Sequence, residues 1–267
     1  MNYPSEINQV TPINGEISFF PPSGTTLFEM GNDGAGNYYG LYWQIGREDQ
    51  EPIVVWMNHE EFTLEPVQTN LNEFLNNYDN ESSELTSYPS LKDEQYFLSC
   101  FQRGKVKSRK DKNEAVRLFK LASDLFPEFS DSWFWLFKLT EEENIEHKIN
   151  YAIRTICSNW TFGLPNKQAV DFIVQSRTNG ITYDDPIFNI ISSSSNTSEL
   201  LNLKVDAVEF YEIATQYKLK GDFVNYLLML QNYSYFSNLS RSEFDSERWK
   251  NELTEAIERH FPNRKYS

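Results

Sequence analysis

The sequence predicts an α+β protein in which a small antiparallel or mixed β-sheet domain is followed by an all-α, helical-repeat-like domain. The first 80 of the 267 residues contain seven of the 11 glycines, and short apolar runs alternate there with turn residues. After residue 93 the apolar residues recur with the period of a helix. The polar stretch between the two patterns has the composition of a linker. We therefore expect a sheet domain over 1–80, a linker over 81–92 and a helical domain over 93–267.

The strands are predicted from the alternation of side chains between two faces. Short strands are expected over 16–20 and 26–30, and longer ones over 37–45 and 52–59. A polar stretch separates the two longer runs, so they are expected to pair as an antiparallel hairpin. One face of the first long run consists of large apolar side chains: Tyr39, Leu41, Trp43 and Ile45.

A helix is predicted to begin after Asn70. The Asn70 side chain is a candidate N-cap, and Glu73 follows it by three residues. Leu71, Phe74 and Leu75 have the spacing of one buried helical face. We expect this helix to pack on the sheet.

The second half is predicted to be helical throughout. Ala115, Phe119, Ala122 and Pro127 have a spacing similar to that of the second helix of a tetratricopeptide repeat, where small residues allow paired helices to approach closely. A degenerate repeat with a peptide-binding concave face and a plain helical bundle both fit this pattern. Further helices are expected over these ranges: 94–103, 132–139, 145–157, 167–175, 204–218, 222–236 and 242–261.

Charge is unevenly distributed along the chain. Residues 1–80 contain one basic residue, Arg47, and twelve acidic ones, a balance of −11 within a total of −15. A negative field of this kind accelerates encounter with a basic protein surface, and it also keeps a protein soluble; both interpretations remain open. It disfavours general affinity for nucleic acid or anionic membranes, and we expect neither as a partner.

A basic run interrupts this pattern. Residues 103–112, RGKVKSRKDK, contain six basic residues at a predicted turn between two helices. The run could dock on the acidic domain, bind an external acidic partner or form a solvated loop. Nucleic-acid binding would require interleaved aromatic residues, and the run has none.

Three segments of the first half, GNDGAGNYYGLYW, PIVVWMNHEEF and NLNEFL, together resemble the core of the SUKH superfamily over residues 16–76. This superfamily includes fungal cell-wall regulators and bacterial immunity proteins. In the family a Gly-Asp/Asn-Gly turn enters a strand, a second strand begins with a Pro-Val/Ile pair and ends near a His, and a helix ends in a Phe-Leu pair. The matching positions here are Gly31, Asp33, Gly34 and Gly36, then Pro52–Val55 with His59, and finally Phe74 with Leu75.

The resemblance implies an α+β fold and a non-enzymatic function, the binding of another protein and often the neutralisation of a toxin domain. The chain departs from the family because it starts almost at the first strand. The one or two helices that usually precede the sheet are then either lost or replaced from the C-terminal half.

We therefore predict an immunity-type inhibitor that occludes a basic toxin domain through an acidic, aromatic surface. The expected partner-binding residues are Asp33, Trp43, Trp56, His59, Glu60 and Glu61. The glycines of the first segment, Gly31, Gly34 and Gly36, are expected to be structural turn residues with positive φ. Two alternatives remain: an adaptor that binds a peptide or an assembly partner through its helical half, and an enzyme with a pocket at His59 and Asp33.

The sequence favours no cofactor or metal. The glycine-rich segment precedes a strand rather than a helix and lacks a P-loop lysine, and His59-Glu60-Glu61 is not H-E-x-x-H because Thr63 holds the last position. Cys100 and Cys157 lie in apolar helical stretches and are expected to be buried thiols. We see no targeting or membrane segment and expect a cytoplasmic protein.

Overall fold

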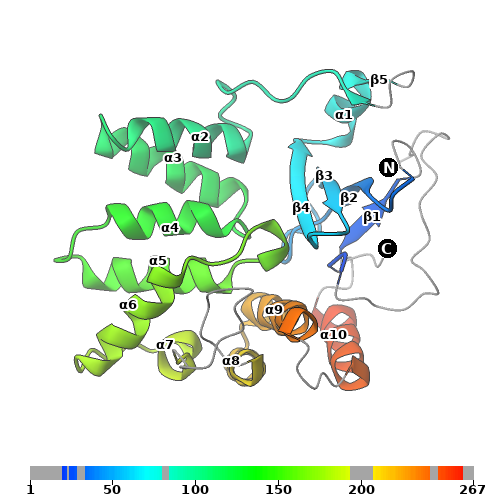
Figure 1. Ribbon diagram of the computed structural model, residues 1–267. Coiled ribbons are helices and arrows are strands. Elements are labelled where there is room, and N and C mark those ends of the chain that lie inside the picture. Colours follow the sequence, from blue (N-terminus) through cyan, green and yellow to red (C-terminus); the bar gives the residue numbers. More distant parts are fainter. Residues whose placement is uncertain are drawn as a thin grey trace. The chain divides into compact units, whose positions relative to one another are not determined.

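The computed structural model confirms the predicted α+β class, with an antiparallel sheet followed by helices (Figure 1). The chain divides into two compact units, which are described separately. Unit 1 comprises Met1–Ser90 and Lys250–Ser267, and unit 2 comprises Leu91–Trp249. The structure describes residues 20–22, 24–28, 34–79, 84–192, 207–240 and 246–260.

Unit 1 contains a four-stranded antiparallel sheet in the order β1-β2-β3-β4. Its strands are β1 (Thr25–Leu27), β2 (Tyr38–Tyr42), β3 (Ile53–Asn58) and β4 (Thr63–Gln68). The predicted hairpin is confirmed, with Leu41 opposite Val54. Strand β4 was not predicted because Glu65 and Pro66 interrupt the apolar pattern, and an edge strand tolerates proline. The strand predicted over 16–20 lies outside the described residues except for Phe20.

The core of unit 1 lies between the sheet and α1 (Leu71–Asn77). Asn70 caps this helix as predicted, because its Oδ1 accepts the Glu73 N–H at 2.9 Å. Both faces of the sheet are buried. Leu41 and Val54 lie on the face that packs against α1, and Val55 and Met57 lie on the opposite face. The main cluster consists of Phe28, Leu41, Val54, Val67, Leu71 and Phe74.

Unit 1 extends past the predicted boundary at residue 80. The short strands β5 (Tyr78–Asp79) and β6 (Glu84–Leu85) pair, and the Thr86 N–H donates to the Asn77 carbonyl at 2.7 Å. Gln68 Nε2 also donates to the Ser87 carbonyl at 2.8 Å. These bonds attach 84–87, which the composition assigns to a linker, to the sheet domain.

Unit 2 consists of helices that pack against their neighbours in sequence. Figure 1 shows α2 to α6 stacked one after another. The helices are α2 (Phe97–Lys107), α3 (Lys112–Leu125), α4 (Ser130–Leu139), α5 (Ile145–Cys157), a 3-10 turn (Trp160–Phe162), α6 (Lys167–Thr178), α7 (Pro186–Ile190), α8 (Ala207–Lys220) and α9 (Phe223–Ser240). The five-residue α7 was not predicted, since it is too short for a helical period to show.

The packing of α2 against α3 depends on a glycine. A Cβ placed on Gly104 would lie 2.7 Å from Cε1 of Phe119, which is too close for any side chain there. Phe119 is fully buried, and Ala115 and Ala122 are buried on the same helix. Phe119, one of the residues predicted on this stripe, therefore contacts α2 at Gly104.

The first two helix pairs recur at a fixed interval. Phe97 and Ser130 begin the first helix of each pair, Lys112 and Ile145 begin the second, and both intervals are 33 residues. A tetratricopeptide-like repeat has a period of about 34 residues. The relation to that repeat stays a prediction, because adjacent helices joined by short turns are also found in plain bundles.

The last helix differs from the predicted division at 93–267. Helix α10 (Ser246–His260) was predicted as part of the helical domain, yet the residues from Lys250 onward group with unit 1. Ala256 and Ile257 on this helix are buried. Periodicity identifies a helix from its own residues, but it carries no information on which unit the helix joins.

Candidate protein-binding surface

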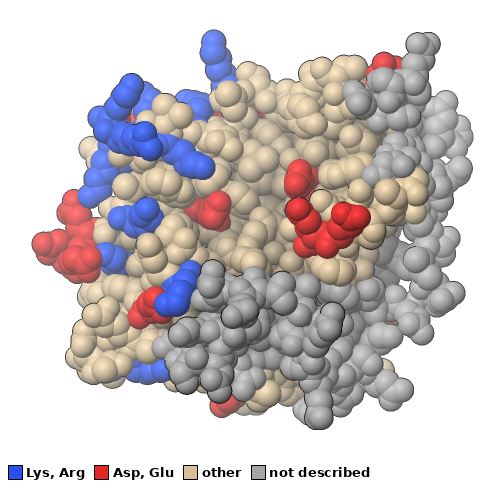
Figure 2. All heavy atoms as spheres, viewed as in Figure 1, with Lys and Arg blue, Asp and Glu red and all other residues tan. Residues whose placement is uncertain are grey.

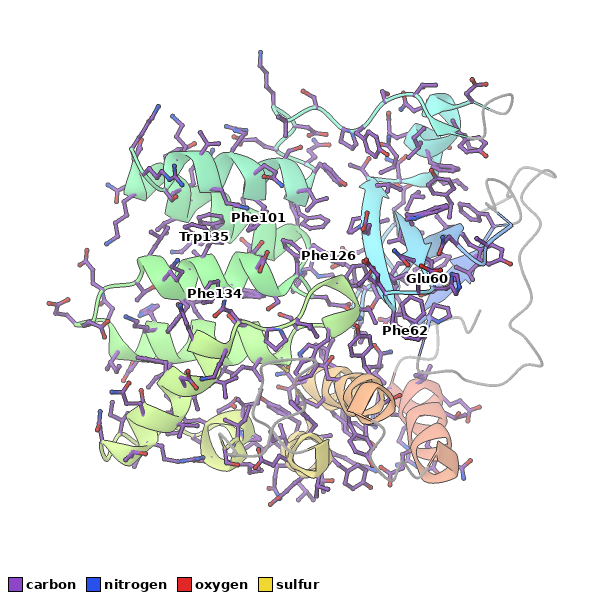
Figure 3. All side chains as sticks on the ribbon, in the orientation of Figure 1. Glu60, Phe62, Phe101, Phe126, Phe134 and Trp135 are labelled. Atoms are coloured by element: carbon purple, nitrogen blue, oxygen red, sulfur yellow. The ribbon has the colours of Figure 1, made fainter. Side chains whose placement is uncertain are left out.

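The turn between β3 and β4, Asn58–Thr63, presents two of the predicted carboxylates; we call it the acidic hairpin. Asn58 pairs with Thr63, and Asn58 Oδ1 accepts the N–H groups of Glu60 and Glu61 at 3.1 Å each. Both glutamates are exposed. Figure 3 labels Glu60 and Phe62 at this turn. The backbone therefore holds two adjacent carboxylates at the end of the sheet.

Phe62 closes the acidic hairpin in a strained conformation. Its φ is 55°, the left-handed region that bulky residues rarely adopt. The Phe62 ring packs edge-to-face on Phe20, with ring centroids 5.7 Å apart. This packing offsets the backbone strain and fixes the turn that carries Glu60 and Glu61.

His59 connects the acidic hairpin to the glycine-rich turn. Asn37 Oδ1 accepts the His59 N–H at 2.9 Å and lies 3.0 Å from Nδ1 of the imidazole. Gly36 has φ 95°, and a Cβ there would lie 3.2 Å from the same Nδ1. Gly34 also has the predicted positive φ, 72°. The structure thus brings His59 and this turn together, whereas Gly31 and Asp33 lie outside the described residues.

The two predicted aromatic anchors are half-buried rather than freely exposed. Trp43 and Trp56 both pack against the core cluster on the α1 side of the sheet. The Trp56 ring lies 4.5 Å from that of Tyr39, and Trp56 is paired across the strands with exposed Glu65. Each tryptophan therefore stabilises the core and leaves only part of its surface for a partner.

Several described carboxylates of unit 1 are exposed to solvent, and these form no ion pair with another described residue. Figure 2 shows acidic side chains gathered over β3 and β4. All the ion pairs found among the described residues lie in unit 2. The exposed carboxylates of unit 1 in the described ranges include Asp49, Glu51, Glu60, Glu61, Glu65 and Glu73.

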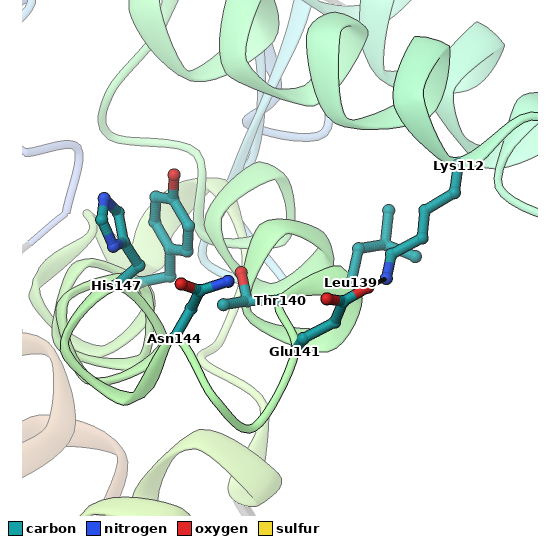
Figure 4. A pocket seen from close by; sticks show the side chains of 7 residues that line it. Lys112, Leu139, Thr140, Glu141, Asn144 and His147 are labelled. Atoms are coloured by element: carbon teal, nitrogen blue, oxygen red, sulfur yellow. Dashed lines mark hydrogen bonds and ion pairs between the residues drawn. The ribbon is translucent and has the colours of Figure 1, made fainter.

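A hollow of about 250 Å³ lies in unit 2, at the start of α3 and the turn between α4 and α5 (Figure 4). Lys112 Nζ and Glu141 Oε1 form an exposed ion pair there at 2.7 Å, and the ammonium group lowers the pKa of Glu141. His147 also lines the hollow and is exposed. The hollow does not contain His59, the residue that the enzyme alternative requires. Its lining residues are Lys112, Leu139, Thr140, Glu141, Asn144, His147 and Tyr151.

A partly buried polar cluster in unit 2 was missed by the sequence interpretation. Asp185 caps α7 by accepting the Ile187 N–H at 2.8 Å, and it also accepts the Tyr217 hydroxyl at 3.0 Å. Cys157 Sγ lies 3.2 Å from Asn225 Oδ1, and burial raises the pKa of both Cys157 and Tyr217. Cys157 and Cys100 are free, buried thiols, as predicted. The Asp-Pro pair that begins α7 was the available signal, since it is typical of a helix start.

Asp185 gives a pH-dependent prediction. Burial raises the pKa of Asp185, so the folded state binds this proton more tightly than the unfolded state does. The contribution of Asp185 to stability is therefore greatest at acidic pH and is lost as pH rises through the raised pKa. Asp185→Asn keeps an oxygen acceptor and removes the charge. We expect its unfolding free energy, relative to the wild type, to increase between about pH 4 and pH 7 in urea titrations. If the difference in unfolding free energy between Asp185→Asn and the wild type were the same at every pH, the pKa of Asp185 would not be raised in the folded state.

Among the described residues, no helix is long and apolar enough to cross a membrane. No group of three or more His, Cys, Asp or Glu side chains is placed to hold a metal ion in the same part of the chain.

Comparisons with known proteins identify relatives without an assigned activity. Residues 11–87 match the family described as the YfbP N-terminal domain, a range that includes the sheet, α1 and the acidic hairpin. The chain is 27% identical over 175 residues to the uncharacterized protein YfbP of Escherichia coli strain K12. The alignment covers 64% of this chain and 62% of that protein. No solved structure gives a significant match. The resemblances to the SUKH superfamily and to the tetratricopeptide repeat stay predictions.

Proposed function

We propose that this chain is a non-enzymatic protein that binds a basic surface of another protein through its acidic hairpin. The observation that supports this most strongly is the pair Glu60 and Glu61, which is exposed on a turn that Asn58 and His59 hold in place. Because the backbone of this turn is already fixed, binding costs little backbone freedom, which favours recognition over nonspecific attraction.

The proposed partner is a toxin domain whose active surface is basic, such as a nuclease. This finer statement rests on the resemblance to the SUKH superfamily and on the excess of acidic residues in 1–80. Carboxylates at the rim of an interface accelerate encounter, and half-buried aromatic side chains such as Trp56 supply apolar contact area. Inhibition would then follow from covering the toxin's cationic cleft.

The test begins with a search of the neighbouring genes for a secreted protein that carries a toxin module, and that module is then co-expressed with this chain. The wild-type chain should restore growth, and Glu60→Lys combined with Glu61→Lys should not. We expect the purified double variant to associate with the module about tenfold more slowly or worse, because the reversed charges repel the basic surface. Stopped-flow association at two salt concentrations measures this rate.

The matched control reverses two charges at the opposite end of the β2-β3 hairpin. Asp49→Lys with Glu51→Lys changes the net charge by the same amount, and both residues are exposed. If the two double variants lose binding equally, overall charge rather than the acidic hairpin is responsible. Unchanged rescue by the Glu60/Glu61 variant, or no rescue by the wild type, would overturn the proposed role of the hairpin.

A second candidate function is an adaptor that binds its partner through unit 2. The recurrence of helix pairs after 33 residues favours it, because stacked helix pairs produce extended binding surfaces. The same experiment separates the two candidates. An adaptor of this kind would bind its partner equally well after reversal of Glu60 and Glu61.

A further inference from the structure

A group of cations lies at the end of α2 and in the turn that leads to α3. Lys105, Lys107, Arg109 and Lys110 are all exposed, and we call them the cationic turn. None of the four forms an ion pair with a residue that the structure describes. Figure 2 shows basic side chains gathered over this end of α2 and α3. The two outer members of the basic run behave differently: Arg103 pairs with Glu94 at 2.9 Å and Lys112 pairs with Glu141 at 2.7 Å.

Three carboxylates around the basic run are already engaged. Glu94 and Glu114 both accept hydrogen bonds from the guanidinium of Arg117, at 2.8 Å for each pair. Asp111 lies within the turn, where its Oδ1 accepts the Glu114 N–H at 3.1 Å and caps α3. These three carboxylates therefore do not neutralise the turn. Asp131 interacts electrostatically with Lys105, whereas Lys107, Arg109 and Lys110 form no ion pair with a described residue.

The helix dipole accounts for only part of this arrangement. Lys105 and Lys107 lie in the last turn of α2, where cations stabilise the helix. Lys105 also lies over the Phe101 ring, with Nζ 5.4 Å from the centroid. Arg109 and Lys110 lie beyond the helix end and form no ion pair with a described residue, so neither helix stability nor pairing within the described part of the chain accounts for these two adjacent cations.

The turn also presents an apolar side chain. Val106 is 67% exposed and lies between Lys105 and Lys107 in the chain. A partner that covers Val106 would gain apolar burial as well as charge pairing. No aromatic ring stands among these residues for base stacking, and the net charge of −15 repels a long polyanion such as nucleic acid.

We propose that the cationic turn binds an acidic protein segment that carries an apolar residue among its carboxylates. This is a second interaction surface, in unit 2, and it does not depend on the function proposed for the acidic hairpin. Three of its four cations are lysines, which suit the variable geometry of separate carboxylates better than the bidentate recognition of phosphate groups. A short acidic segment also carries fewer charges than a nucleic acid and is repelled less by the rest of the chain.

The test is fluorescence anisotropy with the full-length chain and a labelled peptide of sequence EEDLEEDE. We expect binding that weakens as NaCl increases from about 50 mM to about 300 mM. Combined substitution of Lys107→Gln, Arg109→Gln and Lys110→Gln should raise the Kd by about tenfold or more. Val106→Ser should raise the Kd by about twofold to fivefold, because it removes only the apolar contact.

The control removes the same charge elsewhere in unit 2. Lys120→Gln, Arg154→Gln and Lys218→Gln replace three exposed cations, and this variant should keep the wild-type Kd within about twofold. Far-UV circular dichroism checks that both triple variants are folded. The proposal is overturned if the wild type does not bind the peptide, if both triple variants weaken binding equally, or if a single-stranded oligonucleotide of equal charge binds more tightly than the peptide.

Discussion

Phe119→Ala is expected to lower the free energy of unfolding of unit 2 by about 4 kcal/mol, one of the largest effects available in the chain. Phe119 is fully buried, its ring stacks on Trp135 at 5.4 Å, and it lies against Gly104 on the neighbouring helix. Truncation removes these contacts from both α2 and α4 and leaves a cavity at the centre of the stack. Urea unfolding followed by far-UV circular dichroism measures the loss.

A substitution at Gly104 tests the same contact from the other helix. Alanine favours helices by about 1 kcal/mol over glycine, so Gly104→Ala would stabilise α2 if the position were open. Here the added Cβ meets the Phe119 ring at 2.7 Å, and we expect a net loss of about 1–3 kcal/mol. When Gly104→Ala is combined with Phe119→Ala, the added Cβ no longer meets a ring, so it should no longer lower the free energy of unfolding. Additive losses would contradict the packing described for α2 and α3.

The sequence predicted those parts of the fold that depend on local periodicity. The antiparallel pairing of β2 with β3 was predicted from the alternation of side chains along both strands, and the start of α1 was predicted from Asn70 as a cap. Strand β4 was missed because Glu65 and Pro66 interrupt its apolar pattern. A proline is tolerated at a sheet edge, a position that local pattern does not reveal. For the same reason, no local pattern indicated that the residues of α10 from Lys250 onward group with unit 1.

The sequence predicted which residues belong to the candidate surface, but it did not predict how they are arranged. Glu60 and Glu61 are exposed as the sequence suggested, while Trp43 and Trp56 alternate onto the face that α1 covers and are therefore half-buried. The link between His59 and Asn37 joins residues 22 positions apart, and only the pairing of β2 with β3 brings them together. In the basic run, the sequence could not distinguish Arg103 and Lys112, which form ion pairs, from the cations between them, which form none with a residue that the structure describes.

Asn232→Ala is expected to cost about 3 kcal/mol, because it leaves two buried backbone groups without their partner. Asn232 Oδ1 accepts the Trp160 N–H at 3.1 Å, and its Nδ2 donates to the Ser158 carbonyl at 2.7 Å. Asn232 and Trp160 are each 1% exposed, so water cannot replace either bond in the folded state. The side chain therefore connects α9 to the chain segment that follows α5, across more than 70 residues of sequence. Urea unfolding followed by tryptophan fluorescence measures the change.

Two further variants separate this role from a general effect of losing an amide. Asn232→Asp keeps an acceptor for the Trp160 N–H but turns a carboxylate oxygen toward the Ser158 carbonyl, so it should destabilise unit 2 at least as much as alanine does. Asn113→Ala removes an exposed amide from α3 and should change stability by less than about 0.5 kcal/mol. If Asn232→Ala were as mild as Asn113→Ala, the two backbone groups would have found other partners. The connection between α9 and the end of α5 would then depend on apolar packing around Trp160 instead of on Asn232.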